Sequence, residues 1–102
     1  MLKKKPVICA VDKTLHIMGS RWTSLLLHNL FTGKKRFGEF QRAMGGISSK
    51  TLSLRLHELE EAGIITKKVF PEVPLHIEYS LTKKGESLNE IFAKMAEWGK
   101  NH

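Results

Sequence analysis

Apolar residues in the first half of the chain recur every three or four positions, as they do on one face of a helix. This pattern predicts a short helix over residues 9–18 and a second helix that runs from a cap at Ser20 to a stop at Gly33. A third, short helix ends at the Gly45–Gly46 pair. The residues expected on these faces are Val11, Leu15 and Met18 in the first helix, Trp22, Leu25, Leu26 and Leu30 with the polar Asn29 in the second, and Phe37, Phe40 and Met44 in the third.

A fourth helix is predicted over residues 48–62, with Gly63 after it. At 100° per residue, Leu52, Leu56 and Leu59 share a narrow arc, which is expected to pack on the core. The first turn is different, because it carries hydroxyls and a lysine where a helix prefers Ala or Glu. The polar start therefore predicts contact with another molecule. The opposite, outward face collects Lys50, Ser53, Leu54, His57 and Glu61, with Thr51 and Glu58 at its edge.

Beyond Gly63 the period of the apolar positions changes to two. Residues 64–70 and 75–81 predict two strands joined by PEVP, whose Pro71 and Pro74 fit the tip of a hairpin and not its body. Thr82 is a plausible cap for a closing helix. The apolar positions of that helix are Leu88, Ile91, Phe92, Met95 and Trp98.

The order of four helices, a hairpin and a last helix predicts a mainly α fold with a small β hairpin. This is the order of a winged helix-turn-helix with additional N- and C-terminal helices: the third and fourth helices form the helix-turn-helix, and the hairpin is the wing. The chain has 102 residues, which fits a single domain over residues 1–102.

The charge balance indicates a polyanionic partner, most often nucleic acid. Lys and Arg number 17 against 10 Asp and Glu, a formal charge of +7. We therefore expect the fourth helix to bind double-stranded DNA, with simple capping by Ser48 or Thr51 and a stray surface leucine at Leu54 as alternatives. The expected recognition contacts are Ser48, Ser49, Lys50, Thr51, Ser53, Leu54 and His57, and the expected backbone contacts are Lys34, Lys35, Arg36, Lys67, Lys68 and His76.

Other classes of protein fit the sequence poorly. The single cysteine, Cys9, excludes an intramolecular disulfide and a cysteine-rich zinc cluster, and it fits a reducing, cytoplasmic setting. No stretch approaches the roughly 18 apolar residues of a membrane span, so no membrane partner is expected. Five dispersed histidines, with no glycine-rich phosphate loop, predict no enzyme, metal site or cofactor, and no small-molecule effector is identified.

Three stretches carry specific motifs in a fixed order: MGSRWTSLLLHNLFTGKKRFGEFQRAMGGISSKTLSLRLHELEEAGII, then FPEVPLHIEYSLTKKGESL, then AEWG. With them the chain resembles the HxlR family of bacterial winged-helix transcription regulators over nearly its whole length. The resemblance implies a homodimer in which the first and last helices contribute to the dimer interface and the fourth helix reads an inverted repeat. Ser49, Lys50 and Leu54 stand where the family often has proline, arginine and a charged residue, which affects the operator sequence and not the class.

Two further expectations combine the residues with this resemblance. The five apolar positions of the closing helix exceed what a small domain easily hides, so we expect a dimer interface there, with packing on its own domain as the alternative. Family members commonly carry a cysteine just before the first helix, and in some it senses oxidants or electrophiles. Cys9 stands at that position, near a helix start and close to Lys3, Lys4 and Lys5, which favours the thiolate. A buried, inert cysteine is the alternative.

A winged helix can also bind RNA or a protein partner without recognising an operator. An apolar or acidic outward face on the fourth helix would indicate that use. The face here begins basic and rich in hydroxyls, which favours duplex DNA.

Overall fold

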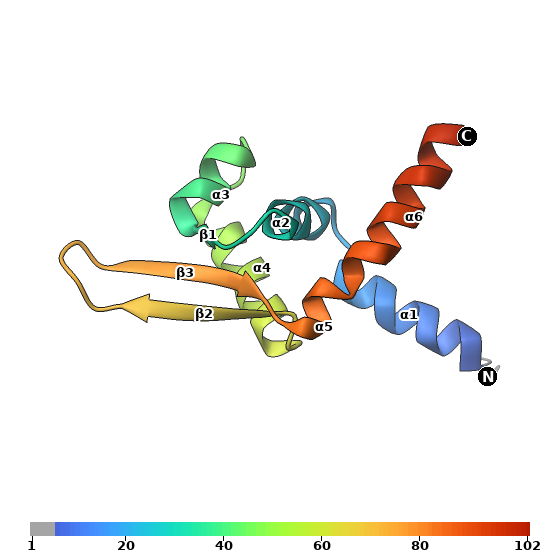
Figure 1. Ribbon diagram of the computed structural model, residues 1–102, viewed down its shortest axis with the longest axis horizontal. Coiled ribbons are helices and arrows are strands. Elements are labelled where there is room, and N and C mark those ends of the chain that lie inside the picture. The colour runs from blue at the N-terminus through green and yellow to red at the C-terminus, as the bar shows by residue number, and fades with distance from the viewer. Residues whose placement is uncertain (1–5) are drawn as a thin grey trace.

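The computed structural model describes residues 6–102 and confirms a mostly helical winged-helix architecture (Figure 1). Helices α1 and α6 project from the same side of the body, and the hairpin extends from the opposite side. Within residues 6–102, none of the helices has the length and apolar character that crossing a bilayer requires. The elements are α1 (Pro6–Met18), α2 (Arg21–Phe31), β1 (Lys35–Arg36), α3 (Phe37–Ala43), α4 (Ser49–Glu61), β2 (Ile65–Phe70), β3 (His76–Leu81), α5 (Lys83–Glu86) and α6 (Leu88–Asn101).

Ser20 caps α2, as predicted, and Ser48 caps α4, which is the alternative to its predicted contact with DNA. The Ser20 hydroxyl accepts a hydrogen bond from the Thr23 backbone N–H at 3.1 Å, and the Ser48 hydroxyl accepts one from the Thr51 backbone N–H at 3.1 Å. Each cap satisfies one of the N–H groups that a helix start leaves without an intrahelical partner. The first helix begins at Pro6, earlier than the apolar pattern indicated.

The buried face of α2 is rotated from the predicted one. Its fully buried positions are Thr23, Leu26, Leu27 and Leu30, whereas Asn29 is only partly buried. The run of three leucines at 25–27 explains the difference, because consecutive apolar residues leave the orientation of a helix undetermined by sequence. The other predicted positions, Trp22 and Leu25, are partly buried and pack at the edge of the core.

The sheet has three strands in the order β1–β3–β2, so the predicted hairpin gains a short third strand. In β1, Lys35 lies opposite Tyr79 and Arg36 lies opposite Glu78. Two residues are too few to produce a visible alternation, which is why the sequence pattern missed this strand. The pairing anchors the wing to the start of α3.

The closing helix is divided into α5 and α6. Thr82 caps α5, as predicted: its hydroxyl accepts from the Gly85 N–H at 3.1 Å and donates to the Gly63 carbonyl at 2.6 Å. Gly85 is buried, and a Cβ atom there would overlap the carbonyl oxygen of Ile64. This close approach of backbones holds α5 against the turn between α4 and β2.

One core connects the helices to the sheet. The Phe40 and Tyr79 rings meet edge to face, with centroids 6.0 Å apart. Leu52, Leu56 and Leu59 are all buried, which confirms the predicted inner face of α4 and turns its other face to solvent. The largest fully buried side chains are Phe40, Leu26, Leu27, Leu52, Ile64 and Ile65.

Candidate nucleic-acid interface

The outward face of α4 is polar and exposed along its length. Lys50, Ser53 and His57 are exposed, and Leu54 keeps 51 % of its surface in contact with solvent. Ser49 is exposed as well, whereas Thr51 is partly buried. The three buried leucines fix this orientation, so the residues predicted to touch DNA share one accessible surface.

Hydroxyl groups at the start of α4 differ in what they can still bind. The Ser48 hydroxyl donates its one proton to Thr51 Oγ1 at 2.9 Å while it accepts from the Thr51 N–H. Ser48 is therefore committed to capping the helix, which is the alternative that the sequence left open. Thr51 Oγ1 acts only as an acceptor in this bond and retains its own proton.

Ser49 is held by a residue that the sequence analysis missed. Gln41, on α3, donates from Nε2 to the Ser49 hydroxyl at 2.9 Å, and both side chains are exposed. The one signal for Gln41 was its place outside the apolar face of the third helix, a few residues before the Gly45–Gly46 pair. This bond connects the two helices of the helix-turn-helix on their outer surface.

The basic residues near α4 are not equally available to a ligand. Among residues 6–102, Lys50 has no ion-pair partner, whereas His57 Nε2 lies 3.6 Å from Glu61 Oε1 and Lys67 Nζ lies 3.9 Å from Glu60 Oε1. Lys50 is therefore the cation of the recognition face with the least competition from the protein's own carboxylates.

Glu78 neutralises part of the predicted backbone-contact set. Its carboxylate lies 3.3 Å from Lys34 Nζ and 3.5 Å from His76 Nε2. Desolvation raises the pKa of Glu78, but the hydrogen bonds and charges of Lys34 and His76 outweigh it, and the net pKa is lowered. Glu78 thus stays ionised at neutral pH and competes with a phosphate for the Lys34 ammonium and the His76 imidazole.

His76 has further contacts that disfavour the phosphate contact predicted for it. Its Nδ1 lies 3.8 Å from Glu72 Oε2, and its ring stacks on Phe70 with centroids 4.4 Å apart. The side chain is 17 % exposed. A phosphate approaching this imidazole would meet two carboxylates, so His76 is the least suitable member of the set.

The rest of that set lies on the wing strand and at β1. Lys68 Nζ lies 5.1 Å from the centre of the Phe70 ring and stays exposed. Lys35 Nζ donates to the Thr32 hydroxyl at 3.0 Å and to the Gly33 carbonyl at 3.3 Å. Arg36 is exposed.

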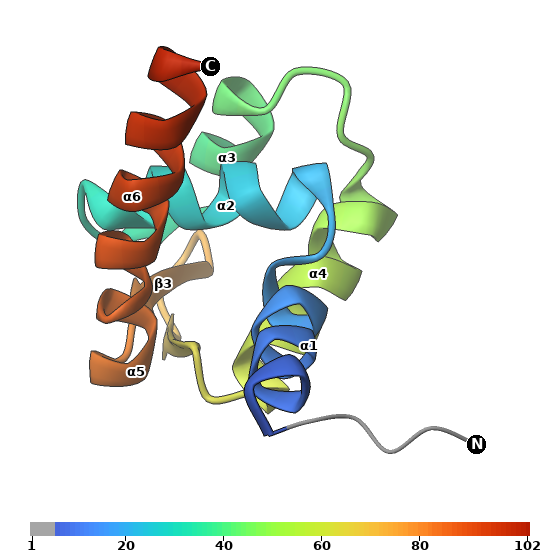
Figure 2. The same cartoon turned by 90° about the vertical axis from the view of Figure 1, so that its right-hand side faces the viewer.

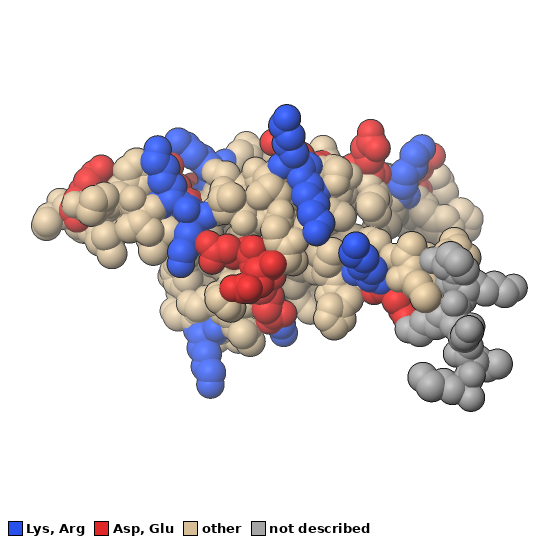
Figure 3. Space-filling view, turned by 90° about the horizontal axis from the view of Figure 1, so that it is seen from below, with Lys and Arg blue, Asp and Glu red and all other residues tan. Residues whose placement is uncertain are grey.

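The wing tip itself carries no cation. Residues 71–75 contain one charged residue, Glu72, and the exposed side chains of Val73 and Leu75. Figure 3 shows the same division: acidic side chains lie near the far end of the narrow lobe, and basic side chains lie closer to the body. Phosphate contacts of the wing are therefore expected from its strands and not from its tip.

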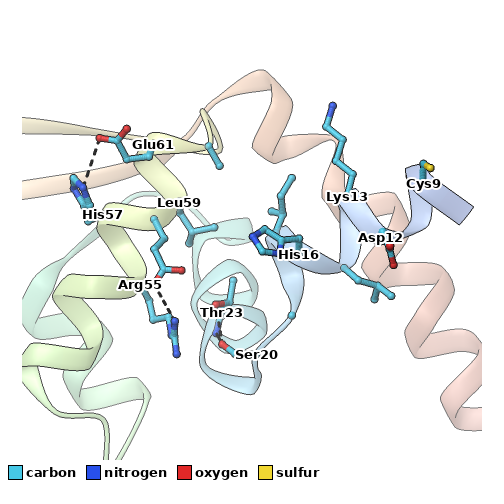
Figure 4. A pocket seen from close by; sticks show the side chains of 15 residues that line it. Cys9, Asp12, Lys13, His16, Ser20, Thr23, Arg55, His57, Leu59 and Glu61 are labelled. Atoms are coloured by element: carbon cyan, nitrogen blue, oxygen red, sulfur yellow. Dashed lines mark hydrogen bonds and ion pairs between the residues drawn. The ribbon is translucent and has the colours of Figure 1, made fainter. Parts of the chain in front are cut away.

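An open groove of about 1390 Å³ separates α1 from α4 (Figure 4). Its lining includes Asp12, Lys13 and His16 of α1 and Arg55 and His57 of α4, and the His16 ring points from α1 toward α4. Cys9 lies at one end, in the first turn of α1, and is exposed, so the alternative of a buried cysteine is wrong. Among residues 6–102, no cluster of His, Cys, Asp and Glu side chains could hold a metal ion. Lys3, Lys4 and Lys5, invoked for the thiolate, lie outside the described residues.

Helices α1 and α6 lie on the side of the molecule that faces the viewer in Figure 2. Each helix presents apolar side chains to solvent. The five predicted interface positions of α6 divide into two groups. Leu88 is buried in the core, and Phe92 packs edge to face on Phe31 at 5.3 Å, so these two stabilise their own domain. The exposed apolar residues are Ile91, Met95 and Trp98 on α6 and Val7, Ile8, Val11 and Leu15 on α1.

Comparisons with known proteins agree with this geometry. The family model for HxlR-like helix-turn-helix proteins matches residues 17–102. The uncharacterized HTH-type transcriptional regulator YdeP of Bacillus subtilis (strain 168) is 42 % identical over 94 residues, which cover 92 % of this chain and 73 % of YdeP.

Two solved structures extend the similarity to the fold. The redox regulator HypR in its oxidised form superimposes with a TM-score of 0.84 at 41 % identity, over 92 % of this chain and 97 % of that chain. The reduced form of the transcriptional regulator YodB from B. subtilis gives a TM-score of 0.80 at 36 % identity, over 94 % and 91 % of the two chains.

Proposed function

Because the chain belongs to the HxlR-like helix-turn-helix family, and is a transcriptional regulator of that type and not an enzyme, we propose that it binds an inverted-repeat operator as a homodimer. In this proposal α4 enters the major groove and reads bases, while cations of the β1–α3 segment and the wing strands bind the flanking phosphates. The proposed setting is the cytoplasm.

One observation carries the proposal: α4 buries Leu52, Leu56 and Leu59 and exposes a face that begins basic and hydroxyl-bearing at the helix N-terminus. Short hydroxyl side chains allow close approach to base edges, and the positive end of the helix dipole favours the negatively charged DNA. The glutamates at the other end, Glu58 and Glu61, are exposed where the helix would leave the groove.

A homodimer explains the exposed apolar stripes of α1 and α6. Pairing of two copies through these stripes would remove apolar surface from water and leave the α4 face of each copy accessible. Two α4 helices related by a twofold axis would then enter successive major grooves, about 10 base pairs apart. The twofold axis therefore predicts an inverted-repeat operator with half-sites at this spacing.

Selection of bound duplexes from a random pool tests the proposal directly. We expect an inverted repeat to be enriched, with half-sites about one helical turn apart, and binding that weakens steeply with added salt. A protein that enriches no duplex sequence, or that prefers single-stranded RNA or a protein partner under the same conditions, would contradict it.

Lys50 and Lys68 are expected to play different parts in binding. Lys50→Ala should weaken operator binding by about 1–3 kcal/mol and random DNA by much less, because Lys50 is exposed on the recognition face and can bond guanine O6 and N7. Lys68→Ala should weaken operator and random DNA alike. Affinities measured for both duplexes at one salt concentration check this.

A third lysine provides the control for this pair. Lys100→Ala removes an exposed charge from α6, away from the α4 face and the wing strands that are proposed to bind DNA, and should change neither affinity. Equal losses on operator and random DNA for Lys50→Ala would reject its reading role.

We propose in addition that Cys9 makes operator binding sensitive to oxidants or electrophiles. The support is the exposure of Cys9 at the start of α1, on a helix of the proposed dimer interface, and the similarity to the redox regulators HypR and YodB. Repeating the duplex selection with reduced and with oxidised protein tests this, with Cys9→Ser as the matched control. An unchanged operator affinity after oxidation would reject the sensor and leave the DNA-binding proposal intact.

A further inference from the structure

A serine hydroxyl has no fixed preference among bases, because it can donate its proton or accept one. In the major groove, purine N7, guanine O6 and thymine O4 are acceptors, whereas cytosine presents only its N4 amino group, a donor. A lone serine on α4 would therefore discriminate weakly between bases. What it reads depends on the hydrogen bond that the protein itself makes to the hydroxyl.

The Gln41 side chain makes such a bond to Ser49. The Nε2 amide proton points at Ser49 Oγ over 2.9 Å, so one lone pair of the hydroxyl is occupied. Among residues 6–102, the Ser49 hydroxyl has no acceptor for its own proton, and the side chain is exposed on the face proposed to meet DNA. Accepting one hydrogen bond also strengthens the O–H as a donor, since consecutive hydrogen bonds polarise one another.

The other hydroxyls in this turn do not share the arrangement. The Ser48 hydroxyl donates its proton to Thr51 Oγ1, and Thr51 is partly buried. Ser49 is thus the one exposed hydroxyl of the first turn of α4 whose direction is set from α3, by a residue eight positions earlier in the chain.

From this geometry we infer that Gln41 is a specificity-determining positioning residue, which holds the Ser49 hydroxyl as a donor toward the DNA. The base at that position of each half-site is then one that presents an acceptor, and cytosine is disfavoured on the contacted strand. The inference rests on the proposed function, and it adds the chemical class of base that this pair selects.

Two substitutions of Gln41 separate a directing role from a structural one. Gln41→Met keeps the length of the side chain but removes the N–H, so the base preference at one position per half-site should fall about threefold to tenfold, with other positions unchanged. Gln41→Glu offers an acceptor to the Ser49 proton, which leaves lone pairs facing the DNA. Cytosine or adenine, which carry amino donors, should rise at that same position.

The measurement is duplex selection from a random pool with wild type and each variant, and thermal unfolding verifies that each variant folds. Ser49→Ala should remove the same preference, and in that background Gln41→Met should have no further effect at the position. A uniform loss of affinity with every base preference retained would overturn the inference, because it would show that Gln41 merely braces α3 against α4.

The same experiment distinguishes the inference from the proposal that underlies it. A wild-type protein that enriches an inverted repeat, together with a Gln41→Met variant that enriches the identical one, overturns only the role of Gln41. A folded wild-type protein that enriches no sequence overturns both.

Discussion

The Met95→Glu variant is expected to sediment as a monomer at micromolar concentration and to bind its operator about 100-fold more weakly than wild type. Met95 is 52 % exposed and lies on α6 between Ile91 and Trp98, which are exposed too. A carboxylate placed in the middle of an apolar interface loses its hydration without gaining a partner. Once the copies separate, each half-site binds alone, and the gain of about 10²–10⁴ from joining two binding sites is lost.

A matched variant on the same helix controls for the added charge. Ala93→Glu places a carboxylate on an exposed position of α6 outside the apolar stripe, and it should leave both the dimer and operator affinity near wild-type values. Sedimentation and operator titration of the two variants check this. A wild-type protein that is monomeric, or a Met95→Glu variant that still dimerises, would contradict the role of this stripe.

The apolar stripe of α6 illustrates why interface residues cannot be identified from periodicity alone. Leu88 and Phe92 fall on one side of the stripe and pack inward, whereas Ile91, Met95 and Trp98 fall on the other side and face solvent. A helical projection places all five on one broad face. Only the position of α2, which supplies Phe31 to Phe92, decides where the core ends and the exposed surface begins.

Sequence reasoning succeeded for α4 because two independent signals agree there. The spacing of Leu52, Leu56 and Leu59 fixes the inner face, and the Ser48 cap fixes the start, so the direction of every other side chain follows. In α2 the three consecutive leucines leave the buried face undetermined by the sequence, and the predicted face is rotated from the observed one. Strand β1 left no pattern, because its two residues are too few to show an alternation.

Hydrogen-bond and ion-pair partners were the least accessible features. Sequence places His76 and Glu78 in the correct strand and Lys34 before the third helix, but their mutual approach depends on β1 lying beside β3. The bond between Gln41 and Ser49 likewise depends on the angle at which α3 meets α4. The composition gives the net charge of the chain. The tertiary structure determines which charged side chains remain available to a ligand.

The Phe40→Ala variant is expected to lose about 3–5 kcal/mol of unfolding free energy. Phe40 is fully buried in α3 and meets Tyr79 of β3 edge to face, so its removal leaves a cavity between the helix-turn-helix and the sheet. Since the free energy of unfolding of such domains is only about 5–15 kcal/mol, the loss of this one side chain removes a large share of the stability that positions α4. Urea unfolding at one fixed protein concentration measures the loss, because the proposed dimer would make stability depend on concentration. Phe37→Ala, at a partly buried position of the same helix, should cost clearly less, and equal losses for the two would mean that the cavity beside Tyr79 is not the cause.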